Sequence, residues 1–407
     1  MVTLSHLPNE LLELCVPVDA HWYLFTGRLV CRRWQEILKG SYNIPRLELN
    51  LSICICINIC RIITLLPGSL RLIRARGFGF WRGSVGFRKF IDSILVHQPT
   101  LRELDISYCS VDCNKDFSTV RLPGSLHRLS MDSLWLEDFS MLQGCTALRE
   151  LVLRRTKISD VTPITGLLSL RKLDIGWTPV TNPSLLRSLT GLKELKMSFV
   201  RQGDSIAVEW LNELPGLCSL TLSGSQLSRV STSAASCRRL RFLDLTFSEI
   251  SDCVFLQTMG AQLTFLGFGG NGNLLNINPI GLYCPGLLKL ELYATPIESV
   301  EALRHCRGLQ CLDISNTKVS NLGPLESLSE LNRLDMIGCA ANSLAPLARC
   351  PKLKVLKCST GKVLYNFEEL AECRSLKRIS LTALGLADIE PIRFVSDVRM
   401  NGFKIIK

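Results

Sequence analysis

The strongest constraint on this chain is a six-residue phrase, L-x-x-L-x-L, that returns thirteen times at nearly constant spacing. The copies begin at Leu101, Leu126, Leu148, Leu170, Leu192, Leu217, Leu240, Leu263, Leu287, Leu309, Leu331, Leu353 and Leu376. Neighbouring starts lie 22 to 25 residues apart. A period of this length indicates structural units that stack along one axis, each burying its apolar residues against the next.

The spacing within the phrase predicts a short strand in each unit. The second and third apolar residues lie two positions apart, so both point to one face of an extended segment. Successive strands are then expected to pair in parallel, about 4.8 Å apart. Proline stands fifteen residues after the start at Pro163, Pro324, Pro346 and Pro391. It predicts return segments made of short turns rather than long helices.

Weaker copies flank the thirteen clear ones. Leu70 with Ile73 and Ala75 precedes them, and Ile44-Leu47-Leu49 is interpreted as the first copy. Val395, Val398 and Met400 form a degenerate last copy.

A small polar or thiol residue recurs eight positions after the first leucine, as in Thr156, Ser248, Asn271 and Cys339. We expect these side chains to turn inward and to hydrogen-bond with backbone amides of the neighbouring unit.

The eighteen cysteines follow the repeat rather than a disulfide pattern. The position three before the start reads Cys145, Leu167, Leu189, Leu214, Cys237, Cys284, Cys306, Leu328, Cys350 and Cys373. Because Cys and Leu alternate at one site, we interpret this site as buried and its thiol as a small hydrophobe. Free thiols in a reducing compartment are therefore favoured over a disulfide network. No histidine stands near Cys54, Cys56 and Cys60 to complete a zinc site, so we expect no metal and no cofactor.

On these residues, the units resemble leucine-rich repeats over roughly residues 44 to 400. The 22-residue copies are similar to the short class of phosphatase-regulating proteins, and the recurring cysteine is similar to the class common in F-box proteins. The resemblance implies an α/β solenoid that is right-handed, with parallel strands lining a concave face.

The segment before the repeats carries two matched words, L-P-N-E-L-L from Leu7 and V-C-R-R-W from Val30. Their identity and separation resemble an F-box motif, although Pro17, Asp19 and Gly27 depart from it. The resemblance implies a substrate receptor of a Skp–cullin–F-box ubiquitin ligase. The residues that would bind the Skp-type adaptor are Leu7, Pro8, Leu11, Leu12, Leu14, Val30, Cys31 and Trp34. The alternative is a helical cap on the open end of the solenoid.

Three parts of the chain are predicted. Residues 1–40 form the F-box-like element or cap, 41–100 hold divergent first repeats with a basic and aromatic insertion, and 101–400 form an array of about thirteen repeats. The insertion, residues 71–90, combines six Lys/Arg with five aromatic residues. That mixture can bind single-stranded nucleic acid, but we favour a loop inserted between repeats over RNA binding.

The register also predicts which residues face outward from the strands. We expect the concave face to bind a protein target, because exposed aromatic side chains on a rigid sheet suit that role. The candidate partner-binding residues are Asp174, Trp177, Phe199, Phe242, Asp244, Phe247, Phe265, Glu291, Tyr293, Asp313 and Asp335. For the acids, solvation of the strands and pairing with neighbouring Lys or Arg is an equally supported interpretation.

Composition narrows the function further. With 47% hydrophobic and 20% charged residues, the chain is not expected to be disordered. Its longest apolar stretch, residues 53–66, is too short for a bilayer span, and its first residues do not resemble a signal peptide. No catalytic motif is present, so we expect a non-enzymatic protein of the cytoplasm or nucleus, monomeric within a complex. The alternative to a ligase receptor is a repeat scaffold or phosphatase-type regulator without a ubiquitin link.

Overall fold

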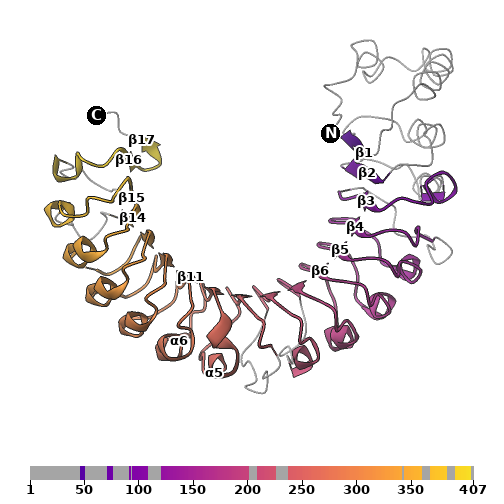
Figure 1. The fold of residues 1–407 in the computed structure, drawn as a ribbon, viewed down its shortest axis with the longest axis horizontal. Helices are drawn as coiled ribbons and strands as arrows, with labels where there is room; N and C mark the ends of the chain where they lie inside the picture. The colour runs from indigo at the N-terminus through magenta and orange to yellow at the C-terminus, as the bar shows by residue number, and fades with distance from the viewer. Residues whose placement is uncertain are drawn as a thin grey trace, which may run out of the picture. The chain divides into compact units, whose positions relative to one another are not determined.

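The computed structural model of the chain describes residues 46–50, 71–76, 91–92, 94–108, 121–200, 209–225, 237–341, 343–359, 367–382 and 390–404. The chain divides into two compact units, Met1–Lys196 and Met197–Lys407, and each is described by itself. Within each unit the strands line the concave side and the short helices the opposite side (Figure 1).

In the first unit, each described strand pairs in parallel with the next one in sequence. These strands are β1 (Arg46–Asn50), β2 (Leu72–Arg76), β3 (Glu103–Asp105), β4 (Arg128–Ser130), β5 (Glu150–Val152), β6 (Lys172–Asp174) and β7 (Glu194–Lys196). The return segments contain the 3₁₀ helices η3 (Ser140–Leu142), η4 (Thr162–Ile164) and η5 (Pro183–Ser188). Strands β1 and β2 confirm the two weak copies at the start of the array.

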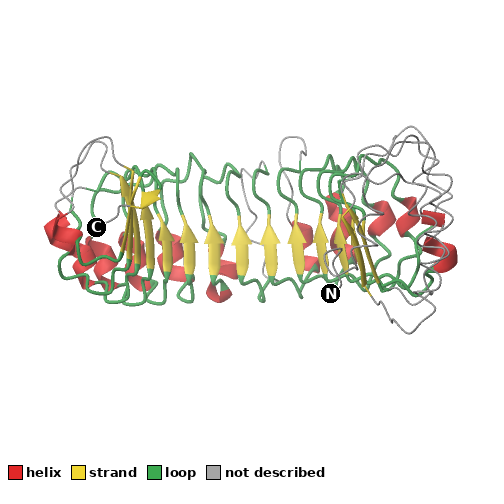
Figure 2. Cartoon of the chain, turned by 90° about the horizontal axis from the view of Figure 1, so that it is seen from above, coloured by secondary structure: helices red, strands yellow, loops and turns green. Residues whose placement is uncertain are grey.

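The second unit continues the same pattern. Its strands are β8 (Ser219–Thr221), β9 (Phe242–Asp244), β10 (Phe265–Gly267), β11 (Lys289–Glu291), β12 (Cys311–Asp313), β13 (Arg333–Met336), β14 (Val355–Ser359), β15 (Arg378–Thr382), β16 (Asp397–Met400) and β17 (Phe403–Lys404). Strands β8 to β16 pair in parallel in chain order, side by side in Figure 2, and β17 is antiparallel to β16. Strand β16 confirms the degenerate last copy.

Short helices form the return segments of the second unit. They are η6 (Glu209–Glu213), α5 (Leu256–Met259), η7 (Gly260–Gln262), α6 (Asn278–Tyr283), η8 (Glu301–His305), η9 (Gly323–Ser327), η10 (Ala345–Arg349), η11 (Phe367–Leu370) and η12 (Glu390–Ile392). The prediction from proline is confirmed, since Pro163, Pro324, Pro346 and Pro391 each lie in a 3₁₀ helix of three to five residues. Proline lacks the N–H that a longer helix would need at that point.

The core lies between the strands and the return segments and repeats from unit to unit. The middle residues of neighbouring strands stand opposite one another, as Leu290 does with Leu312, and both are buried. The predicted cysteine position is also confirmed as buried, from Cys145 to Cys373. All of the cysteines that the structure describes are free.

Seven positions after the start of a repeat, the backbone turns into the left-handed region in eleven described repeats. This is seen at Tyr108, Ser133, Arg155, Trp177, Phe199, Gly224, Phe247, Gly270, Ala294, Asn316 and Gly338, with φ between 53° and 73°. The N–H of the turn residue itself pairs along the sheet, so Phe247 N donates to Gly269 O at 2.8 Å. The hydrogen-bond ladder thus extends beyond the strand. A bulky residue at such a φ costs about 1–3 kcal/mol, which the ladder and the core must offset.

The inward polar position differs in part from our expectation. Thr178 and Thr295 do not contact amides of the neighbouring unit; each hydroxyl donates to a carbonyl three residues earlier, at 2.5 and 2.6 Å. Serine at the same position does reach the preceding repeat, since the hydroxyls of Ser225 and Ser248 donate to Met197 O at 3.2 Å and to Leu222 O at 2.9 Å, but these acceptors are carbonyls rather than amides. The longer Asn271 does reach across, and its Oδ1 accepts hydrogen bonds from Ser248 N and Ile250 N.

Two of the predicted segments lie wholly or mostly outside the residues that the structure describes. The F-box-like residues 1–40 and most of the basic segment, residues 77–90, lie outside the described residues. The three-part domain division and the right-handed coiling therefore stay predictions. Among the residues that the structure describes, no helix is long and apolar enough to cross a membrane.

Candidate functional site

The candidate site is the exposed strand surface of β9 to β12 in the second unit, which we call the aromatic–acidic face. It consists of Phe242, Asp244, Phe247, Phe265, Glu291, Tyr293 and Asp313. The first and third residues of these strands point away from the core, because the buried middle leucine points into it. The repeat therefore brings to one surface residues that lie up to 71 positions apart in sequence.

Four aromatic rings form the apolar part of this face. Phe242 and Phe265 stand opposite each other on β9 and β10. Their rings stack with centroids 4.1 Å apart and an interplanar angle of 6°. The rings of Phe247 and Tyr293 meet edge to face at 6.0 Å. Phe247 remains 52% exposed, so the face offers apolar area to a partner.

Glycines of the β10 repeat make room for these rings. A Cβ on Gly269 would lie 2.3 Å from a ring carbon of Tyr293, and a Cβ on Gly270 would lie 2.2 Å from one of Phe247. The two rings thus rest directly on the backbone of Gly269 and Gly270. The run Phe265-Leu266-Gly267-Phe268-Gly269-Gly270 is the sequence signal for this ring-on-backbone packing.

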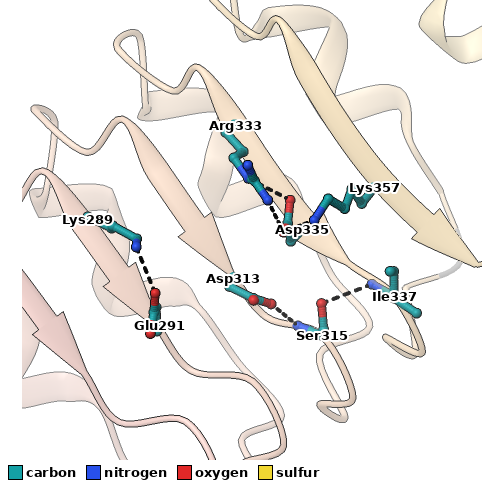
Figure 3. Close-up of polar contacts among 8 residues, drawn as sticks. All are labelled: Lys289, Glu291, Asp313, Ser315, Arg333, Asp335, Ile337 and Lys357. Carbon is teal, nitrogen blue, oxygen red and sulfur yellow. Dashed lines mark hydrogen bonds and ion pairs between the residues drawn. The ribbon is translucent and has the colours of Figure 1, made fainter. Parts of the chain in front are cut away.

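Three of the five candidate acids have a structural task that the sequence analysis did not foresee. A carboxylate oxygen of Asp174, Asp244 and Asp313 accepts the backbone N–H two residues later, at 2.9 to 3.0 Å. This bond holds the turn that follows the strand. Figure 3 shows it for Asp313 and Ser315, whose hydroxyl in turn accepts from Ile337 N at 3.2 Å.

Ion pairs neutralise two acids of the row. Lys289 Nζ lies 2.8 Å from Glu291 on the same strand. Arg333 holds Asp335 with two hydrogen bonds of 3.0 and 2.8 Å, and Lys357 adds a contact at 3.0 Å (Figure 3). These pairs support pairing with Lys or Arg as the role of Asp335, which is also buried and thus a poor partner-binding residue.

Tyr293 lies among the carboxylates. Burial raises the pKa of its phenol, and the nearby charges of Glu291, Asp244 and Asp313 raise it further, against a hydrogen bond with Thr246. The hydroxyl therefore stays protonated at neutral pH and can donate a hydrogen bond. The combined surface is apolar at its rings and negative at its edge.

Two of the predicted residues lie in the first unit. Asp174 is half-buried, and burial raises its pKa although Gly176 N–H and the charges of Lys196 and Arg154 oppose that shift. Trp177 is 45% exposed, with the Arg155 guanidinium 5.9 Å from its ring. These two do not belong to the aromatic–acidic face. Phe199 belongs to the second unit, where its ring covers Gly224.

Trp135 and Tyr108 are exposed aromatic residues that the sequence analysis missed. Tyr108 occupies the seventh position of its repeat, as Trp177 and Phe247 do, so this register position was the available signal. Trp135 lies in an irregular segment after β4 and no repeat position predicts it. Lys157 Nζ stands 5.7 Å from its ring.

A shallow depression lies over β2 to β5 in the first unit, with a volume of about 220 Å³. Arg128 crosses it and pairs with Glu150 at 2.6 Å and Glu103 at 3.9 Å. The space is smaller than a typical small-molecule site and its charges are already paired. Within the described ranges, no group of three or more His, Cys, Asp or Glu is arranged to hold a metal ion.

Solved structures with the same fold are found in bacteria. An internalin from Listeria monocytogenes is 17% identical with a TM-score of 0.60, and the match covers 91% of this chain and 93% of the internalin. A leucine-rich-repeat protein from Leptospira interrogans is 18% identical with a TM-score of 0.67, covering 90% and 93%. The fold is that of the leucine-rich-repeat proteins. No family model and no curated protein matches the sequence.

Proposed function

We propose that this protein is a binding module whose aromatic–acidic face holds a protein partner. The observation that supports it is the group of four aromatic rings, stacked and partly exposed, on strands whose backbone is held in a continuous ladder. Aromatic residues dominate the binding energy of protein interfaces, and a rigid sheet loses little conformational freedom when it binds.

The test compares the intact protein with a Phe247→Ala/Tyr293→Ala variant. A partner isolated with the intact chain is purified, and its affinity is measured by calorimetry. We expect at least a tenfold loss of affinity, because truncating an aromatic anchor costs about 2 kcal/mol or more. Leu282→Ala is the control, since Leu282 is 67% exposed on α6, on the opposite side of the unit (Figure 1). Equal affinity of the double variant would contradict the proposal.

We further propose that the partner is a substrate delivered to a Skp–cullin–F-box ubiquitin ligase, with residues 1–40 binding the adaptor. Support comes only from the sequence words that begin at Leu7 and Val30. A purified Skp-type adaptor should bind the intact chain and lose that binding with Pro8→Ala/Trp34→Ala while the circular dichroism spectrum is unchanged. If the adaptor does not bind the intact, folded chain, the alternative in which residues 1–40 only cap the solenoid is favoured.

The alternative is a scaffold or phosphatase-type regulator that uses the same face without a ubiquitin link; a partner that is bound but not ubiquitylated in a reconstituted reaction would favour it. RNA binding through residues 71–90 is the less favoured alternative, and a steep loss of binding with added salt would be its signature.

We propose that the protein acts in the cytoplasm or nucleus.

A further inference from the structure

The acids of the aromatic–acidic face are not equally neutralised. Asp313 lies between Glu291 and Asp335 in the strand register, so three carboxylates stand on adjacent strands about 4.8 Å apart. Like charges this close repel unless cations lie between them.

Strands β11 and β13 each carry a basic residue that pairs with the acid on the same strand, whereas β12 carries none. The first strand position carries Lys289 on β11 and Arg333 on β13, and each pairs with the acid two residues later. On β12 that position is Cys311, which is half-exposed. Asp313 accepts the Ser315 N–H but forms no ion pair among the residues described here. Figure 3 shows it between the two compensated acids.

Aromatic surface adjoins this carboxylate, on which the charge of Arg333 acts without forming an ion pair. The charges of Asp313 and Glu291 act on the phenol of Tyr293, and the rings of Tyr293 and Phe247 pack edge to face. A cation beside a ring face and a carboxylate gains from both interactions, more so when the site is partly desolvated. Lys289, with Nζ 5.0 Å from the centre of the Phe265 ring and 2.8 Å from Glu291, already shows this arrangement within the chain.

We propose that the aromatic–acidic face takes an arginine or lysine side chain of its protein partner, placed between Asp313 and the Tyr293 ring. The inference rests on the proposed function and specifies its partner: a segment in which a basic residue is flanked by apolar ones. The basic group completes the row of ion pairs that Lys289 and Arg333 begin, and the apolar neighbours cover Phe247 and the Phe242–Phe265 stack.

The test uses a displayed library of random sixteen-residue peptides, selected on the intact protein. We expect the recovered binders to be enriched severalfold in Arg or Lys next to apolar residues. Each binder is then measured against Asp313→Asn and Cys311→Arg. The first variant removes the charge, and the second supplies the cation from within the chain, as Arg333 does for Asp335. Both should weaken binding at least tenfold.

Val355→Arg is the matched control, because it adds the same charge at the same strand position of β14, beside Lys357 instead of an acid. It should bind as the intact protein does, and thermal melting checks that each variant is folded. Binders that depend on Tyr293 and Phe247 but tolerate Asp313→Asn and Cys311→Arg would overturn this inference and leave the proposed function standing. Binders indifferent to both rings would overturn the inference together with the proposed function.

Discussion

At the scale of the residue, a few buried polar side chains hold each repeat to the next. Asn271 is fully buried and donates to Leu245 O and Phe268 O at 2.8 and 2.7 Å. Its oxygen accepts from Ser248 N and Ile250 N at 3.0 and 2.9 Å. One side chain thus satisfies four backbone groups that belong to buried residues.

Replacing Asn271 with Ala should therefore lower the free energy of unfolding by about 2–4 kcal/mol, because each unsatisfied buried group costs about 1–3 kcal/mol. Urea unfolding followed by circular dichroism measures it. Asn273→Ala is the control, since that side chain is exposed and its loss should cost almost nothing. Equal unfolding midpoints for the two variants would show that the four bonds are not important.

The buried thiols make a second prediction at this scale. Burial raises the pKa of Cys145, Cys284 and Cys350 to about 12, from an ordinary value of 9.0. Near pH 8 these thiols should resist iodoacetamide in the native protein, whereas the half-exposed Cys311 should react, as mass spectrometry would show. Modification of Cys284 as fast as Cys311 would contradict the packing.

The same shifts predict a loss of stability in alkali. A thiol whose pKa is raised by folding contributes stability that is fully present below about pH 9 and is lost as the pH rises toward about 12. The urea midpoint should therefore fall between about pH 8 and pH 10.5. A Cys145→Ala/Cys284→Ala/Cys350→Ala variant should show a smaller fall over that window, even though it is less stable throughout.

At the scale of the element, the return segments pack closely enough to require glycine. In α6, a Cβ on Gly281 would lie 2.2 Å from the carbonyl oxygen of Ala302 in η8. Gly281→Ala should therefore destabilise the protein by about 1–3 kcal/mol, because backbone must move to admit the methyl group. Thermal unfolding measures the effect.

Gly286→Ala is the matched control, since the nearest atoms to its Cβ would be 3.7 and 3.8 Å away. It should be neutral or stabilise by up to about 1 kcal/mol, by restricting the unfolded chain. A Gly281→Ala protein as stable as the control would refute the close packing of α6 on η8.

Elements with a strict period were predictable, and elements set by local chemistry were not. The leucine register predicted β3 to β16 and the buried cysteines, because each position recurs many times and is buried in repeat after repeat. The carboxylate that caps β6, β9 and β12 was missed, since the pattern of Asp244 or Asp313 alone does not distinguish a cap from a partner contact. The rest of the site depends on Gly269 and Gly270, whose role appears only once the rings of neighbouring repeats are placed above them.

At the scale of the whole molecule, one architecture serves two purposes. The leucines that hold the units together also fix which side chains face outward, so a few substitutions on the strands set the partner without disturbing the core. On β9 to β12 the outward residues include the aromatic and acidic side chains to which we assign the binding function.

The most direct test of that claim is site-specific photo-crosslinking with p-benzoylphenylalanine placed at position 247 or, as a control, at position 282. Both native residues are exposed apolar side chains, so the probe is tolerated at either place. We predict a specific crosslinked protein partner from position 247 and none from position 282. The same partner crosslinked equally from both positions, or only from position 282, would contradict it.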